Sequence, residues 1–412
     1  MNSATITPLD GAGITAPQGW RAIGIACGLR YSGRPDLALL VSDAACTAAA
    51  LFTTNKIKAA HILYDQPILM HNAAGIRALL VNAGSANACT GDAGVQDCAT
   101  VAQAVEQTLG LPAQSALVMS TGVIGVPLRV PSMVAGIATA AAQLDTTPAA
   151  ALLAARAIMT TDTYPKQYAV QVRLADGHSF TIGGMAKGSG MIHPNMATML
   201  GVLPTDAAVA PEVLHAALRY VADRSFHCIS VDGDTSTNDT LLALANGQAG
   251  GPPITELDSP RGHALLQGML AVAQPLARDV VRDGEGATRL VTIHVRGAAD
   301  DAAAHQAAMT VATSALVKTA LFGADPNWGR VVCALGYSNT PLDPQRLVLW
   351  FGGIKVFEHG VPLDFDERAA HQLLDQAEVV IDADLGLGTG TATVWTCDFS
   401  YQYVKINAEY RT

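Results

Sequence analysis

The chain has 412 residues, enough for two or three domains, and half of them are hydrophobic while only 15% are charged. This balance is typical of a globular protein and excludes a disordered one. The formal net charge of −10 and the lack of any basic run argue against nucleic acid or an anionic membrane surface as partners.

The same composition gives expectations about compartment and cysteines. No apolar stretch is long enough to span a bilayer, because the alanine-rich segment 134–155 contains Gln143, Asp145 and Pro148. The first residues lack the features of a signal peptide, so we expect a cytoplasmic protein. Seven cysteines with wide spacing and no CxxC indicate neither a disulfide framework nor a metal site, and most are interpreted as small buried residues.

The first half of the chain predicts strands that alternate with helices. Short apolar runs predict strands at 78–81 and 116–119, the second ending in Ser120-Thr121-Gly122. A helix capped by Asp92 and ending at Gly110 is expected between them, and a second helix at 148–159. Residues 168–174 alternate in polarity, and a turn at 175–177 followed by 179–185 predicts a hairpin.

The second half predicts a further α/β unit. Helices are expected at 211–225, 257–281 and 302–321, and strands at 228–231, 288–295, 347–356, 379–384 and 392–398. We expect an α/β protein with parallel and antiparallel pairing, whose topology these patterns leave open. A soft boundary at Asp283-Gly284 divides a domain of residues 1–282 from a C-terminal domain of residues 283–412.

The segment from Gly184 to Leu200 contains the residues that are the best candidates for a chemical reaction. It contains Lys187, several glycines and the pair Ala197-Thr198. A threonine after a small residue can attack the preceding carbonyl group, and water then opens the ester to free Thr198 as a new first residue. Its hydroxyl is a weak nucleophile, and its α-amine, with a pKa near ~8, can take the hydroxyl proton. By spacing alone an ordinary loop is the commoner interpretation, and the GxxxxGK[ST] pattern of a phosphate-binding loop is absent.

Several motifs in order give the chain a resemblance that covers nearly its whole length. KGSGMIHPNMATML around Thr198 resembles the cleavage-site signature of the ornithine acetyltransferase family, the glutamate N-acetyltransferases of arginine biosynthesis. The other matching segments are LVNAGSANACTG at 80–91, STGVIG at 120–125, IMTTDTYPK at 158–166, SVDGDTSTND at 230–239, DPNWGR at 325–330 and INAEYRT at 406–412.

The resemblance implies a self-cleaving acetyltransferase. Cleavage between Ala197 and Thr198 would give an α chain of residues 1–197 and a β chain of residues 198–412, two of each in the assembly. Thr198 would take acetyl from N-acetylornithine and pass it to glutamate in a ping-pong reaction with no dissociable cofactor. Some members also use acetyl-CoA as donor. The implied fold is a layered α-β-β-α sandwich, similar to the self-processing aminopeptidases, with a C-terminal α/β domain.

The resemblance also assigns site residues. The Thr121 hydroxyl and the Gly122 N–H match an oxyanion hole, whose donors must be aimed at the developing negative charge in advance. The residues that match substrate-binding positions are Thr161, Lys187, Thr198, Glu285, Asn407 and Thr412. A lysine suits the α-carboxylate of an amino acid, and a glutamate suits the cationic end of ornithine. Because residues 160, 161 and 163 are all threonines, the family position assigned to Thr161 could fall one or two residues away.

Other interpretations are kept beside this one. His193 is five residues before Thr198, but the α-amine already supplies a base, so we expect no catalytic histidine. Asp232 and Asp234 are expected to form turns and caps and not to bind a metal. A hydrolase with the same nucleophile, of the aminopeptidase type, is the main alternative, and an unprocessed binding protein is a third. Without the resemblance, the C-terminal tail would be predicted to be disordered.

Overall fold

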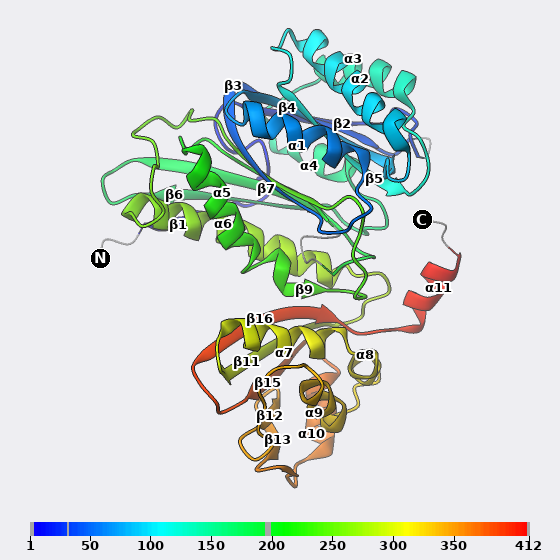
Figure 1. The fold of residues 1–412 in the computed structure, drawn as a ribbon, viewed down its shortest axis with the longest axis vertical. Coiled ribbons are helices and arrows are strands. Elements are labelled where there is room, and N and C mark those ends of the chain that lie inside the picture. Colours follow the sequence, from blue (N-terminus) through cyan, green and yellow to red (C-terminus); the bar gives the residue numbers. More distant parts are fainter. Residues whose placement is uncertain (1–3, 31–32, 194–198, 410–412) are drawn as a thin grey trace.

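The structure of the protein, a computed structural model, describes residues 4–30, 33–193 and 199–409. The predicted cleavage pair Ala197-Thr198 and the predicted ligand Thr412 lie outside these ranges. Figure 1 shows two α/β units one above the other, with the C-terminal helix beside them. Within the described ranges, every helix is too short or too polar to cross a membrane.

The long strand β3 (Leu37–Phe52) organises the first sheet. Its first half pairs with β2 (Trp20–Ile25) and β4 (Ile76–Ser85), and its second half pairs antiparallel with β10 (Thr240–Ala245). The pairing is irregular between Val41 and Cys46, where one half passes into the other. One strand therefore belongs to two layers of sheet.

Each layer has its own set of strands. The first layer consists of β2, the start of β3, β4 and β5 (Ala116–Val123), and β4 and β5 are parallel. The second layer consists of the end of β3, β10, β8 (Leu200–Thr205), β7 (Ser179–Lys187), β6 (Lys166–Arg173) and β1 (Thr5–Pro8). The predicted hairpin at 168–185 is confirmed as the antiparallel pair β6–β7.

Side chains from both layers meet in one core. Trp20 and Leu117 of the first layer share a buried cluster with Val202 and Leu242 of the second. The helix α4 (Pro148–Ala157) contributes alanines to the same cluster, so it lies between the layers at one side. Small side chains let the helix approach β2 closely.

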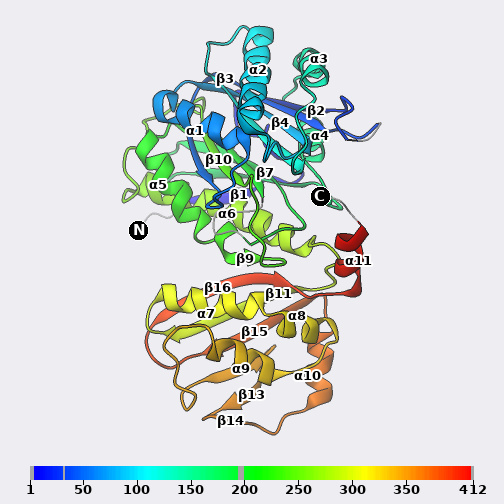
Figure 2. The same cartoon turned by 45° about the vertical axis from the view of Figure 1, so that its right-hand side comes forward.

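Helices cover both outer faces. The first layer packs against α2 (Gly91–Leu109) and α3 (Val130–Ala141), with α1 (Ala60–Asn72) against α2. The second layer packs against α5 (Pro211–Ala222) and α6 (Pro260–Arg282). Figures 1 and 2 show these helices on opposite sides of the strands. The predicted α-β-β-α sandwich is confirmed by this arrangement.

A second sheet forms the lower unit. Its strands, in order across the sheet, are β14 (Val361–Pro362), β13 (Ile354–Glu358), β12 (Val348–Phe351), β15 (Glu378–Asp384), β11 (Leu290–Ala298), β16 (Gly390–Cys397) and β9 (Ile229–Ser230). The helices of this unit are α7 (Asp301–Thr313), α8 (Ala315–Phe322), α9 (Trp328–Gly336) and α10 (Glu367–Leu374). Strand β9 follows the short 3₁₀ turn 226–228 and joins this sheet although it precedes the predicted boundary at 283.

The C-terminal helix α11 (Tyr401–Glu409) follows β16 and returns toward the sandwich (Figure 2). The Ser400 hydroxyl donates to the Gly286 carbonyl oxygen at 2.5 Å, and the rings of Phe399 and Tyr403 are stacked. The tail is therefore helical up to Glu409, and the disorder that its terminal position alone would predict is wrong for this part.

Several predicted boundaries differ from the structure. Helix α2 begins after Thr90, so Asp92 lies in its first turn and is not the cap. The predicted helix 302–321 is two helices, because Ser314 adopts an extended backbone and caps α8 through Val317 N–H. The predicted strand 347–356 is two strands, since Gly352 and Gly353 have positive φ and form a turn.

Candidate active site

The predicted oxyanion pair lies where β5 ends beside β4. Gly122 has φ of +133°, and an added Cβ would come within 2.4 Å of the backbone of Gly84 on β4. Only glycine fits at this contact, because any side chain would push the two strands apart. Thr121, the residue before it, is buried. The close approach of the two strands therefore fixes the backbone at the end of β5.

Lys187 ends strand β7 and reaches this pair. Its ammonium donates a hydrogen bond to the Thr121 hydroxyl at 3.3 Å, and the residue is only 8% exposed. In the sheet Lys187 pairs with Leu200 of β8, two residues after Thr198 in the chain. The structure thus brings Lys187 and Thr121 together, beside the point where the described chain resumes at Met199.

Asp162 faces the same lysine. Burial lowers the pKa of Lys187, while the charge of Asp162 opposes that shift. Burial by itself would raise the pKa of Asp162, but the nearby charges of Lys166 and Lys187 and the hydrogen bond from Gly188 N–H hold that pKa well below its usual range. The carboxylate is therefore ionised and compensates the buried positive charge.

A second lysine binds two carboxylates behind the site. The Lys166 ammonium, 0% exposed, contacts Asp162 at 2.8 Å and Asp283 at 2.5 Å. We call Asp162, Lys166 and Asp283 the buried triad. Asp283 follows the last residue of α6 and also accepts hydrogen bonds from the backbone N–H and hydroxyl of Thr163. The triad ties the loop after α4 to the end of α6.

The contacts of the triad help to decide which threonine of residues 160–163 can bind a substrate. The Thr163 hydroxyl is bound to Asp283, and the Thr160 carbonyl oxygen accepts from Arg30 at 2.9 Å. The Thr161 side chain, half-buried, has no hydrogen bond to any described residue. Of the threonines at 160, 161 and 163, Thr163 has its hydroxyl bound to a described residue, so Thr160 and Thr161 both remain candidates for a ligand.

Glu285 and Asn407 lie together on the other side of residues 187–190. Glu285 N–H donates to the Ser189 carbonyl oxygen at 3.0 Å, and its side chain is 7% exposed. The Asn407 amide on α11 donates to the Glu285 carboxylate at 2.9 Å. An added Cβ at Gly190 would lie 2.3 Å from that carboxylate, so a larger residue there would displace the Glu285 side chain. The returning tail thus contacts the predicted acidic ligand.

One buried acid that the motifs did not single out lies against Met199, the residue that follows Thr198 in the chain. Asp239, 5% exposed, begins the segment that enters β10, and its carboxylate accepts a hydrogen bond from the N–H of Met199. Its second oxygen has no partner among the described residues. Burial raises the pKa of Asp239 well above its usual value, while Lys187 opposes the shift. The motif SVDGDTSTND contains this residue, but its spacing gave no reason to select it.

Asp232 has the turn-forming role that was predicted for it. Its carboxylate accepts hydrogen bonds from the backbone N–H groups of Met191, Ile192 and Asp234. His193 contacts the Ser230 hydroxyl at 3.2 Å, and burial lowers its pKa. Asp232 therefore holds the backbone at residues 191 and 192.

The cysteines divide between core and surface. Cys46, Cys98, Cys228 and Cys397 are buried, as predicted for most of them, while Cys89 and Cys333 are exposed and Cys27 is intermediate. Burial raises the pKa of the Cys46 thiol to about 12, which keeps it protonated and unreactive.

Four of the predicted site residues thus belong to one connected group: Thr121, Lys187, Glu285 and Asn407. Thr121 contacts Lys187, which begins the segment 187–190, and Glu285 with Asn407 contacts the end of that segment. The site offers a positive group for a carboxylate, a negative group for an ammonium, and a hydroxyl next to a glycine N–H. A small ligand that carries charges of both signs matches this chemistry.

The chain matches a known family over most of its length. The model of the ArgJ family matches residues 21–412. The chain is 49% identical to the arginine biosynthesis bifunctional protein ArgJ of Symbiobacterium thermophilum, over 97% of this chain and 98% of that protein. It is 44% identical to the mitochondrial ArgJ of Schizosaccharomyces japonicus, over 97% of this chain and 94% of that protein.

Solved structures of similar proteins cover parts of the chain. The crystal structure of ArgJ from Bacillus halodurans is 39% identical over 50% of this chain and 96% of that chain, with a TM-score of 0.48. The structure of ornithine acetyltransferase from Mycobacterium tuberculosis in complex with ornithine is 38% identical over 46% of this chain and 99% of that chain, with a TM-score of 0.42.

The buried triad can be tested by removing its central charge. Replacement Lys166→Met should remove the ammonium that Asp162 and Asp283 share and lower the free energy of unfolding by about 3–5 kcal/mol, measured by urea denaturation. The control Arg21→Met breaks the exposed ion pair with Asp43 and should cost less than about 1 kcal/mol. Equal losses in the two variants would show that the triad does not hold the site together.

Proposed function

The chain belongs to the ArgJ family, and on that premise we propose that it transfers acetyl from N-acetylornithine to glutamate in arginine biosynthesis. One observation carries the proposal. The segment 187–190 has a buried ammonium at its start, Lys187, and the carboxylate of Glu285 lies beside Gly190 at its end. Free amino acids with an α-carboxylate and a charged side chain match such a pair of charges.

The first half of the proposed reaction forms an acetyl-enzyme. Cleavage after Ala197 would free the α-amine of Thr198, which then takes the proton of its own hydroxyl. The Thr198 oxygen attacks the acetyl carbonyl of N-acetylornithine, and the negative charge develops toward the Thr121 hydroxyl and the Gly122 N–H. Such donors are worth ~3 kcal/mol each in comparable sites. The amide C–N bond breaks, and the ornithine amine leaves with the proton.

The second half returns the enzyme to its starting state. The α-amine of glutamate attacks the acetyl ester of Thr198 and becomes N-acetylglutamate. The ester C–O bond breaks, and the Thr198 hydroxyl regains a proton through its α-amine. The same oxyanion donors serve both halves, and no dissociable cofactor is required by this scheme. The proximity of Thr121 to Lys187 supports a shared site for the two amino acids.

In this scheme each charged residue binds a different end of the substrate. Lys187 holds the α-carboxylate, and Glu285, oriented by Asn407, holds the cationic end of ornithine. Thr161 supplies a hydroxyl that no described residue uses. Thr412 is carried over from the family resemblance as a further ligand.

Both products of the proposed cleavage contribute to the site. Thr121, Thr161 and Lys187 belong to the α chain 1–197, whereas Asp239, Glu285 and Asn407 belong to the β chain 198–412. The contact between Ser189 and Glu285 and the triad contact between Lys166 and Asp283 cross the cut. We therefore propose that the α and β chains stay associated, and the family resemblance adds the proposal of two copies of each.

The acetyl acceptor distinguishes this proposal from a hydrolase. Incubation of the protein with N-acetylornithine should release ornithine rapidly only when glutamate is present, together with N-acetylglutamate in equal amount. The products can be followed by liquid chromatography and mass spectrometry. Ornithine release at the same rate without glutamate would mean that water is the acceptor and that the protein is a hydrolase.

The role of Thr198 gives a linked prediction about processing. Replacement Thr198→Ala should leave a single band of the full chain on a denaturing gel and abolish acetyl transfer, because it removes the hydroxyl that both steps need. Thr198→Ser keeps a hydroxyl and an α-amine, so it should still be cleaved and retain part of the activity. A Thr198→Ala protein that is cut, or that transfers acetyl, would contradict the proposal.

The charge of Lys187 predicts a pH dependence of substrate binding. Burial lowers its pKa, so the ammonium loses its proton at a lower pH than the usual ~10.4 as the solution becomes alkaline. The KM for glutamate should therefore rise with pH before an ordinary lysine would titrate. Lys187→Arg keeps its charge over the whole range, so its KM should stay level with pH even if it is higher. Matching profiles for the two proteins would exclude Lys187 as the carboxylate ligand.

A further inference from the structure

A buried lysine on α8 takes no part in the proposed reaction. Lys318 is 1% exposed, and its ammonium donates hydrogen bonds to the Thr396 hydroxyl at 2.8 Å and to the Cys397 carbonyl oxygen, both at the end of β16. Burial lowers the pKa of Lys318, while the negative charges of Asp398 and Asp232 oppose that shift. Because a buried charge is stable only with its partners in place, this lysine holds the end of β16 in one arrangement.

Lys318 lies beside the turn by which the chain leaves β16 for α11. Its carbonyl oxygen accepts a hydrogen bond from Phe399 N–H at 3.2 Å, and its ammonium is 4.6 Å from the centre of the Phe399 ring. An aromatic ring attracts a cation over its face, most strongly where water is excluded. One turn later on α8, the Phe322 ring packs edge-on against Tyr401 of α11, with 5.4 Å between ring centres. Helix α8 therefore contacts the tail at two successive points.

The contacts continue along α11 to the candidate site. The Phe399 ring is stacked on Tyr403, with 4.8 Å between ring centres. The Tyr403 carbonyl oxygen accepts a hydrogen bond from the Asn407 amide at 3.0 Å, and the same amide donates to Glu285 at 2.9 Å. A chain of direct contacts thus leads from the buried lysine to the carboxylate that we assign to the cationic end of ornithine.

Helix α11 depends on these contacts, because it buries none of its own side chains. It has nine residues, none of them buried, and Tyr401 and Val404 are 84% and 66% exposed. Figures 1 and 2 show the helix at the edge of the molecule. Isolated helices shorter than about 12–15 residues are marginal in water. The position of α11 is therefore fixed by the turn that precedes it and by the few side chains that reach from it to the site.

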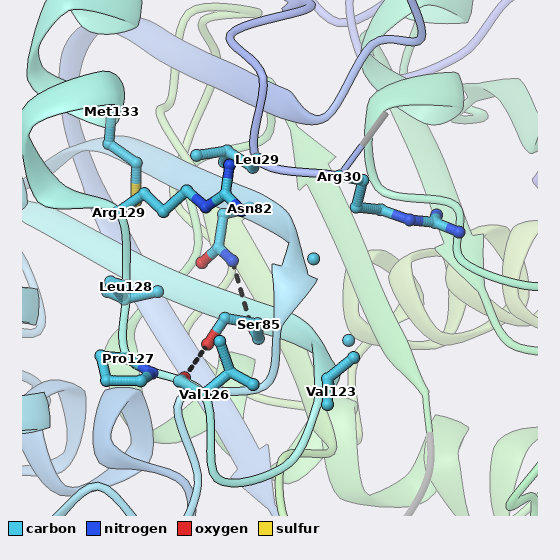
Figure 3. A pocket seen from close by; sticks show the side chains of 12 residues that line it. Leu29, Arg30, Asn82, Ser85, Val123, Val126, Pro127, Leu128, Arg129 and Met133 are labelled. Carbon is cyan, nitrogen blue, oxygen red and sulfur yellow. Dashed lines mark hydrogen bonds between the residues drawn. The ribbon is translucent and has the colours of Figure 1, made fainter. Parts of the chain in front are cut away.

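Among the described residues, the tail contacts one end of the site. Asn407 binds Glu285, whereas the other end, at Gly122, opens on a cavity of about 240 Å³ between the ends of β4 and β5 and the start of α3 (Figure 3). The described residues that line this cavity fall between 29 and 133, so none of them is on α8 or the tail. A displaced tail should therefore disturb the Glu285 end and leave the Gly122 end unchanged.

We propose that Lys318 is a positioning residue that sets the affinity of the site for the cationic end of ornithine. Through the turn at Phe399 it holds α11 where Asn407 orients the Glu285 carboxylate. Without the ammonium, the turn loses the charge that its ring faces, and α11 has no buried side chain that could keep it in place. This inference rests on the proposed function, because it takes Glu285 as the ligand of the cationic end.

The two substrates of the proposed reaction separate this role from a general loss of structure. N-acetylornithine has an ammonium at the end of its side chain, whereas glutamate has a carboxylate there. Of the two, the first needs the orientation of Glu285. In a ping-pong reaction kcat/KM for each substrate reports its own half-reaction, so the two values can be compared within one variant.

The experiment uses the processed protein and two variants. Lys318→Met removes the charge and keeps most of the side chain, and Phe399→Leu removes the ring at a half-buried position. Lys355→Met is the matched control, because Lys355 is in the same unit, forms an ion pair with Glu358 and also lies over a ring, that of Trp350. For each protein kcat/KM is measured with N-acetylornithine and with glutamate, and ornithine binding is measured by calorimetry.

We expect Lys318→Met to lower kcat/KM for N-acetylornithine and to weaken ornithine binding about 10-fold, as for loss of one hydrogen bond to a charged group, and to leave kcat/KM for glutamate within about twofold. Phe399→Leu should cause the same pattern with smaller losses, and Lys355→Met should match the wild type. In the Asn407→Ala background, Lys318→Met should cause no further loss, because the lysine acts through Asn407.

Four results would overturn the proposal. Equal losses of kcat/KM for the two substrates would give Lys318 a general structural role. Losses that multiply in the double variant would mean that Lys318 does not act through Asn407. Unchanged ornithine binding in Phe399→Leu would break the chain of contacts, and this variant with its own Asn407→Ala double decides the matter if Lys318→Met does not fold. Normal ornithine binding by Lys318→Met would refute the inference and leave the proposed function intact, whereas absence of acetyl transfer by the wild type would refute the proposed function.

Discussion

The contact of one buried ammonium with two carboxylates holds this site together. Lys166 bridges Asp162, in the loop after α4, and Asp283, at the end of α6. Asp162 also accepts from Gly188 N–H, which fixes the segment that follows Lys187. Because a buried charge is stable only with its partners in place, the three segments must come together in one geometry. The distance between the lysine end and the glutamate end of the site follows from that requirement.

The charges of the site are arranged so that each is compensated in the protein before a ligand arrives. Lys187 faces Asp162 and Asp239, and Glu285 accepts from Asn407 on the returning tail. These partners come from segments on both sides of the proposed cut, so cleavage would change the end of the chain without separating the site.

A strand or helix could be predicted from the sequence when only one of its faces is buried, because its polar and apolar residues then follow a regular pattern. The hairpin β6–β7 was recognisable because polar and apolar residues alternate from 168 to 174, as expected when one face is covered. Strand β3 was missed, because LALLVSDAACTAAALF shows no alternation: one strand serves two layers and is buried over most of its length. The prediction of a single helix at 302–321 was wrong at Ser314. This serine caps a new helix, but its sequence context is also compatible with the middle of a helix.

The sequence by itself determined the class of fold, the segment that carries the chemistry and the resemblance from which Thr121, Gly122, Lys187, Glu285 and Asn407 were selected. Those conclusions need only local pattern and motif order. The tertiary structure decided which residues meet: that Lys187 reaches Thr121, that Asn407 returns to Glu285, and that Asp239 lies against Met199. Such contacts join residues tens to hundreds of positions apart, and their energies come from burial and charge compensation, which exist only once the chain has folded.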